Sequence, residues 1–411
     1  MNTETKFWNK NFILYVIAFE LAEMGHSLLS FAIPIYILIV TNDPTLVGTV
    51  MTISWLPFAL FLPFGGVLAD RFSKRKVIVL CNFLIAVAIG GYMIGTGNTD
   101  VLLLSVMMLV LMTILQSLQS PSFETVLYEI IPMEELMRAN QVTWILMIGS
   151  GVLAPIIAGW LLSHFGLNVI MSVSMTLFLG ATCLNIFLKI PFEKTQATKG
   201  IFSVITSDLK ASFKFVWFED EVLKKGTIGL VLYSLVLGPV VGIIPPIFIN
   251  AILEMNERVL GFAQGLIALG GILGVMLLGR LGERVTAKKL SHLLISSSVT
   301  LIATTLIFML VPSRGMAFVV LIFGSLAVNT ILVMFSLNYF TYLGQNTPEE
   351  MVGKVMAFAM TVMLLAWSLA QFIVGRLFNL FENNLALAAL VLPAIVLCLA
   401  FTTIVKEEKT V

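Results

Sequence analysis

Long apolar runs separated by short polar segments make up most of this chain. A helix needs roughly 20 apolar residues to cross about 30 Å of hydrocarbon, and twelve runs reach that length. The pattern therefore predicts an all-α membrane protein with twelve transmembrane helices. We expect them at residues 11–40, 45–68, 77–96, 101–128, 139–162, 168–190, 226–253, 258–281, 290–311, 316–343, 354–380 and 385–405.

One longer polar segment, residues 191–225, divides these spans into six and six. We therefore predict an N-terminal six-helix bundle at 1–190, a cytoplasmic linker at 191–225 and a C-terminal six-helix bundle at 226–411. Ile201, Val204, Ile205 and Leu209 recur within the linker at helical spacing. Part of the linker is thus either an amphipathic helix on the membrane surface or a plain tether.

Composition agrees with lipid as the solvent. Hydrophobic residues make up 59% of the chain and charged residues only 11%, against about 25% charged in average proteins. Cys81, Cys183 and Cys398 all lie inside apolar runs, which offers neither a metal-ligand cluster nor a disulfide framework. Lys6 and Lys10 precede an apolar run that is longer than the core of a signal peptide, so we expect a retained first span.

The positive charges predict the orientation. Lys and Arg are enriched in short cytoplasmic loops. With both termini in the cytoplasm, all of the 24 Lys and Arg residues except Arg258, Arg314 and Arg376 fall on the cytoplasmic side. We expect a multi-pass protein of the cell membrane with this topology.

A densely charged hairpin joins the second and third predicted spans. It begins at Gly66 and continues with Asp70, Arg71, Arg75 and Lys76. About half the chain further on, a weaker copy repeats the glycine, the acid, the arginine and the trailing cations, as Gly279, Glu283, Arg284, Lys288 and Lys289. A second pair of loops is related in the same way, with Pro132, Glu134 and Arg138 matched by Pro348, Glu350 and Lys354. The chain is therefore predicted to be an internal duplication.

These loops carry a resemblance to a known family. The segment Gly66 to Arg71 followed by Lys74 resembles the loop signature of the major facilitator superfamily, although Ser73 stands where glycine is usual. The loop at Pro348 and Gly353 is similar to that of the bacterial macrolide and multidrug efflux branch. The resemblance covers the whole chain and implies two rocking bundles. The small residues around Pro155 resemble the antiporter signature in a relaxed form.

The charged loops would then act as a cytoplasmic gate, in which Asp70 pairs with a nearby cation or helix end. The other reading is that they only set topology and loop folding. The expected gate residues are Gly66, Asp70, Arg71, Arg75, Glu129, Glu283 and Arg284.

The first span holds the most informative side chains. A rise of about 1.5 Å per residue places Glu20 and Glu23 near the middle of the membrane. With His26 they lie within one arc of the helix. A carboxylate there costs several kcal/mol unless it is protonated or paired, so we predict that these three residues couple transport to protons. They could instead only hold helices together.

Polar and aromatic side chains are predicted to bind substrate. Spacing places Gln116, Gln119 and Glu124 in one stripe of the fourth span, where interhelical hydrogen bonding is the competing explanation. The second half offers no carboxylate away from a helix end. Its candidates are Tyr233, Asn329, Ser336, Trp367 and Gln371.

Motifs for a phosphate-binding loop, a zinc protease and a serine hydrolase are lacking. We therefore expect no enzyme, no cofactor and no metal, and a monomer whose partners are a small amphiphilic substrate, protons and the lipid bilayer, with no nucleic acid. The favoured function is proton-coupled efflux of amphiphilic, drug-like compounds by alternating access. The alternatives are a transporter of lipids, lysolipids or metabolites and a non-transporting membrane receptor.

Overall fold

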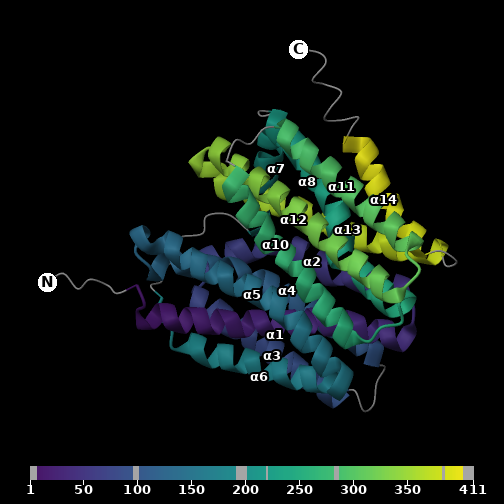
Figure 1. Ribbon diagram of the computed structural model, residues 1–411. Helices are drawn as coiled ribbons and strands as arrows, with labels where there is room; N and C mark the ends of the chain where they lie inside the picture. Colours follow the sequence, from purple (N-terminus) through teal and green to yellow (C-terminus); the bar gives the residue numbers. More distant parts are fainter. Residues whose placement is uncertain are drawn as a thin grey trace. The chain divides into compact units, whose positions relative to one another are not determined.

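The computed structural model describes residues 7–95, 101–190, 201–218, 221–281, 287–381 and 385–400. Within these ranges the chain forms helices and contains no strand, which confirms the all-α prediction (Figure 1). In chain order the helices are α1 (Lys10–Thr41), α2 (Pro44–Arg71), α3 (Lys74–Gly95), α4 (Val101–Ile130), η1 (Met133–Glu135), α5 (Leu136–Phe165), α6 (Leu167–Ile186), α7 (Ile201–Phe218), α8 (Glu221–Val241), α9 (Ile244–Pro246), η2 (Ile247–Ile252), α10 (Glu257–Leu281), α11 (Ala287–Leu310), α12 (Arg314–Asn346), α13 (Glu349–Leu380) and α14 (Leu385–Ala400).

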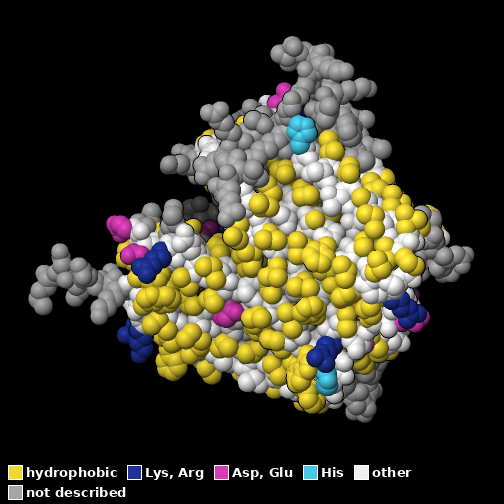
Figure 2. Space-filling model, in the orientation of Figure 1, with side chains coloured by type: hydrophobic (Ala, Val, Ile, Leu, Met, Phe, Trp, Pro, Cys, Tyr) yellow, Lys and Arg dark blue, Asp and Glu magenta, His cyan; other side chains and the backbone are white. Residues whose placement is uncertain are grey.

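Eleven described spans are long and apolar enough to cross a membrane. The twelfth expected span corresponds to α14, of which 16 residues are described, and the rest of it lies outside the described residues. Hydrophobic side chains also cover much of the outer surface, as Figure 2 shows for one face. Such a surface suits contact with lipid, because a soluble monomer rarely exposes a large apolar patch.

The seventh expected span, at 226–253, is broken. Helix α8 ends at Val241, and the chain continues through the short α9 into the π-helix η2. Pro245 and Pro246 have no backbone N–H, so they cannot continue the helical hydrogen-bond ladder. The side-chain amide of Gln264 donates to the carbonyl oxygen of Val241 at 3.4 Å, which satisfies the acceptor that Pro245 leaves open.

The chain divides into two compact units. Unit 1 contains Met1–Tyr36 and Pro57–Ile205, and unit 2 contains Ile37–Leu56 and Thr206–Val411. In unit 1, α3 packs on α4 and α6. In unit 2, α12 packs on α10 and α11, and α8 packs on α13. The end of α1 and the first half of α2 are part of unit 2.

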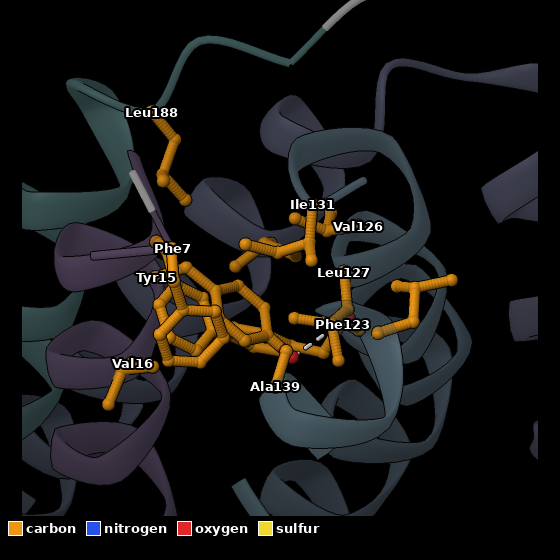
Figure 3. Packing of buried hydrophobic residues seen from close by; sticks show 12 residues of the cluster. Phe7, Tyr15, Val16, Phe123, Val126, Leu127, Ile131, Ala139 and Leu188 are labelled. Atoms are coloured by element: carbon orange, nitrogen blue, oxygen red, sulfur yellow. Dashed lines mark hydrogen bonds between the residues drawn. The ribbon is translucent and has the colours of Figure 1, made fainter. Parts of the chain in front are cut away.

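An apolar cluster joins α1, α4 and α5 in unit 1 (Figure 3). The Tyr15 ring of α1 lies 6.2 Å from the Phe123 ring of α4, and the Tyr15 hydroxyl donates to the Phe123 carbonyl oxygen at 3.2 Å. The guanidinium of Arg138, in α5, lies 4.3 Å from the centre of the Phe7 ring. These contacts fix the first three turns of α1 and so set the position of the residues that follow.

Glycines allow the closest helix contacts. Pro121 has no N–H, so the Ser117 carbonyl in α4 lacks its usual partner, and Gly65 of α2 lies directly against that carbonyl. In unit 2, a Cβ at Gly270 would lie 2.5 Å from the Leu326 carbonyl oxygen, and one at Gly274 would lie 2.7 Å from that of Thr330. A side chain at these positions would push α10 away from α12.

We expect Gly274→Ala to destabilise unit 2 by about 1 to 3 kcal/mol, because the added methyl group overpacks against backbone that cannot rotate away. Gly271→Ala, in the same helix, is the matched control, since its Cβ would meet only the Val333 side chain at 3.8 Å. Thermal unfolding of both variants in detergent measures the difference. Equal apparent Tm values for the two variants would contradict the proposed packing.

Candidate functional site

A hydrogen bond inside unit 1 connects Glu20 of α1 to Ser150 of α5. The Ser150 hydroxyl donates to Oε1 of Glu20 at 2.5 Å. The second carboxyl oxygen, Oε2, is buried and has no hydrogen-bond partner. An ionised carboxylate with a buried, unpaired oxygen is costly, so this oxygen is where a proton or a ligand donor would bind.

The next two turns of α1 continue this polar face. Glu23 is partly buried, and the next polar ring belongs to His26. Nε2 of His26 lies 3.3 Å from the Ser30 hydroxyl, while its Nδ1 is buried without a partner. Counted from Lys10 at about 1.5 Å per residue, Glu20 lies roughly 15 Å and His26 roughly 24 Å along the helix. The three predicted coupling residues therefore occupy the middle of α1.

Two side chains of the polar stripe of α4 form a hydrogen bond with each other. Nε2 of Gln119 donates to Oε1 of Gln116 at 2.5 Å, and Oε1 of Gln119 is buried without a partner. Glu124, further along α4, is exposed. Gln119 thus resembles Glu20, because each has one buried side-chain oxygen without a hydrogen-bond partner.

Two of the predicted substrate residues of unit 2 hold helices together. Asn329 of α12 donates to the Ile267 carbonyl of α10 at 2.8 Å. Gln371 of α13 donates to the Gly238 carbonyl of α8 at 2.6 Å. Ser336 donates to the carbonyl of Val333, one turn back in α12. Each of these contacts is the interhelical or local hydrogen bond expected of polar residues in a membrane.

Two aromatic pairs lie among these contacts. The Tyr233 ring of α8 stacks on Phe335 of α12, with centroids 5.4 Å apart and an angle of 21°. The Trp367 ring of α13 lies 6.1 Å from that of Trp55 in the first half of α2. The indole N–H of Trp367 and Oε1 of Gln371 are both buried without partners. One turn of α13 therefore contains one hydrogen-bond donor and one hydrogen-bond acceptor that have no partner.

The charged hairpin between α2 and α3 is held by a different cation from those expected. Lys74 of α3 forms an ion pair with Glu129 of α4, and both side chains are largely shielded, with exposures of 19% and 27%. Arg75 donates to the Leu188 carbonyl at 3.2 Å. Within the described part of the chain Asp70 is exposed and takes part in no ion pair.

The remaining gate candidates give less information. The backbone at Gly66 has open space around the position of a Cβ. Arg71 ends α2 and is partly buried. Glu283 and Arg284 lie outside the described residues.

Three partners were missed at the sequence level. These are Ser150 for Glu20, Lys74 for Glu129 and Trp55 for Trp367. The alternation of apolar and polar residues along a single helix does not show which helix lies opposite. A further ion pair, Lys354 with Asp208 at 2.8 Å, ties α13 to the linker helix α7 in unit 2.

Comparison with known proteins is consistent with this architecture. The model of the Major Facilitator Superfamily matches residues 15–371. An enterobactin exporter, EntS, of Shigella boydii serotype 4 (strain Sb227) is 26% identical over 332 residues, which are 80% of this chain and 76% of that protein. EntS of Escherichia coli O1:K1 / APEC matches at the same identity and coverage.

Solved structures show the same fold at low identity. A point mutant of the nucleoside transporter NupG superposes with a TM-score of 0.71 at 15% identity, covering 96% of this chain and 98% of that one. A bacterial homologue of the human lysosomal transporter Spinster, crystallised inward-facing and unoccupied, gives a TM-score of 0.70 at 15% identity, covering 98% and 99%.

Charge reversal tests the ion pair between α3 and α4. We expect Lys74→Glu and Glu129→Lys each to destabilise the protein by about 1 kcal/mol or more, because each places like charges in a partly shielded site. The double variant should recover most of the loss. Thermal unfolding of the four proteins in detergent measures this coupling, and purely additive losses would mean that the pair contributes nothing to stability.

Proposed function

The chain belongs to the Major Facilitator Superfamily, and from this premise we propose that it is a proton-coupled exporter of an amphiphilic compound. Transporters of this fold bind at the middle of the membrane and expose the site to each side in turn. The proposal assigns the shared proton and substrate site to the polar face of α1.

The carrying observation is the unpaired oxygen of Glu20. Its Oε1 is held by Ser150, and its Oε2 is buried and open. A carboxyl group in this setting is stable when it carries a proton, or when a cationic or hydrogen-bond-donating substrate contacts the carboxylate. Because the two occupants would exclude each other, one acid is enough to exchange a proton for a substrate.

Other residues take supporting roles in this proposal. Glu23 and His26 continue the polar face and would pass the proton along α1. Gln116, Gln119 and Glu124 would contact the polar part of the substrate. The ion pair of Lys74 with Glu129 would act in the cytoplasmic gate, with both chain termini in the cytoplasm.

The direction of transport is supported by the relatives. The curated relatives quoted above are named as exporters of enterobactin. Enterobactin is therefore a rational probe beside lipophilic cations. A lipid, lysolipid or metabolite substrate is the competing function of the same fold, and counterflow in liposomes separates any transporter from a receptor.

We expect the wild-type protein, purified in weakly buffered detergent, to release protons when a lipophilic cation or enterobactin is added. Glu20→Gln should abolish the release, because an amide cannot give up a proton. A pH indicator dye measures it. Glu221→Gln is the matched control, since Glu221 is an exposed acid that pairs with Lys225 one turn away on α8.

Substrate binding without proton release in the wild type would overturn proton coupling and favour a uniporter or lipid carrier. Release that persists in Glu20→Gln and is lost in Glu23→Gln would move the exchange site one turn along α1. Thermal unfolding of each variant shows whether a lost signal reflects a lost fold.

A further inference from the structure

A cavity lies in unit 2. It has a volume of about 310 Å³ and is bordered by the last turn of α1, the residue after it, η2 and the start of α10. Leu38, Ile39, Asn42, Asn250, Glu254 and Glu257 contribute to its lining. Glu20, Glu23 and His26 are not among its lining residues, so this cavity is a different site from the proposed exchange site.

The backbone is irregular in both of the segments that line this cavity. Asn42 and Glu254, with φ of 49° and 54°, are the non-glycine residues of the described chain that adopt left-handed backbone. Both line the cavity. Asn250 lies in the π-helix η2, which also borders it. Such conformations are costly and are concentrated at functional sites.

The polar lining favours a donor with positive charge. Oδ1 of Asn250 is buried and has no partner. Of the two carboxylates, Glu254 is paired with Arg314 at 2.7 Å, while Glu257 takes part in no ion pair among the described residues. The charges therefore leave a net negative cavity with an open acceptor, to which an N–H donor would bind.

The size of the cavity and its apolar lining residues restrict the kind of cation that can bind there. A water molecule occupies about 30 Å³, so a single inorganic ion would leave most of the cavity empty. The described residues also contain no group of three His, Cys, Asp or Glu side chains that could hold a metal. Leu38, Ile39 and Met255 provide a hydrocarbon surface, which needs an apolar group on the ligand.

We propose that this cavity is a binding site for a small primary ammonium compound with a hydrocarbon or aromatic tail. The ammonium group donates to Asn250 and Glu257, and the tail lies against Leu38, Ile39 and Met255. Because the ligand touches both the end of α1 and the segment from η2 to α10, its binding stabilises this arrangement of unit 2.

The test is a calorimetric titration of 2-phenylethylammonium into the full-length protein in detergent. We expect saturable binding that weakens by about tenfold or more in Glu257→Gln and in Asn250→Leu, since each removes a charge-assisted or buried hydrogen bond. Its N,N,N-trimethyl derivative, which has the charge without the donors, should bind about tenfold more weakly, and 2-phenylethanol should not bind. Glu221→Gln should bind like the wild type.

Equal binding of the amine and its trimethyl derivative would overturn the proposal, as would unchanged binding in Glu257→Gln or no binding at millimolar amine. Stoichiometric binding of calcium in place of the amine would also overturn it. If Asn250→Leu fails to fold, Glu257→Gln still tests the site, because Glu257 is only partly buried. Loss of binding in Glu20→Gln would show that the amine occupies the exchange site.

Discussion

A backbone that crosses lipid has to satisfy every N–H and C=O group without help from water, and this requirement accounts for the contacts that shape both units. At two of the prolines that open the ladder, a neighbouring residue lies at the gap. Pro121 frees the Ser117 carbonyl, and Gly65 comes close enough to cover it. Pro245 frees the Val241 carbonyl, and Gln264 donates to it.

The same requirement separates structural polar side chains from those that can react. Asn329 donates to a backbone carbonyl of the neighbouring α10 and so joins two helices. Glu20 has one oxygen held by Ser150 and the other buried and open. The Asn329 amide has its hydrogen-bond partner within the protein. The Glu20 carboxyl group, by contrast, is stable only when a proton or a hydrogen-bond donor binds to its second oxygen. Burial alone does not distinguish the two cases, because the Asn329 side chain and Oε2 of Glu20 are both buried.

The sequence predicted the helices well because the membrane imposes a length and an apolar composition on each span. It also placed Glu20 and Glu23 at mid-helix, since depth follows from helical rise. It did not predict the neighbours. Lys74 and Glu129 pair across 55 positions of sequence, and Ser150 reaches Glu20 across 130. When a helix is apolar on all sides, its sequence does not indicate which face packs against which neighbouring helix.

The assignment of α1 and α2 to both units was equally hidden from the sequence. The first half of α2 is held on α13 through its small residues, as Thr45 donates to the Gly375 carbonyl at 3.1 Å and Thr52 to that of Ser368 at 3.0 Å. Such bonds to backbone do not depend on the partner's side chain, so residue type at the partner position gives no signal.

Two prolines lie where these helices pass from one unit to the other. The first segment of unit 1 ends at Tyr36, two residues after Pro34 of α1. The second segment of unit 1 begins at Pro57 of α2. Each proline removes one hydrogen bond from the ladder of its helix, so bending there breaks less than bending elsewhere. A helix shared by two units has to transmit or absorb any movement between them. In α1 a turn with one hydrogen bond fewer is therefore located close to the division, and α2 has two such turns, at Pro57 and at Pro63. The polar face of Glu20 lies on the part of α1 that belongs to unit 1.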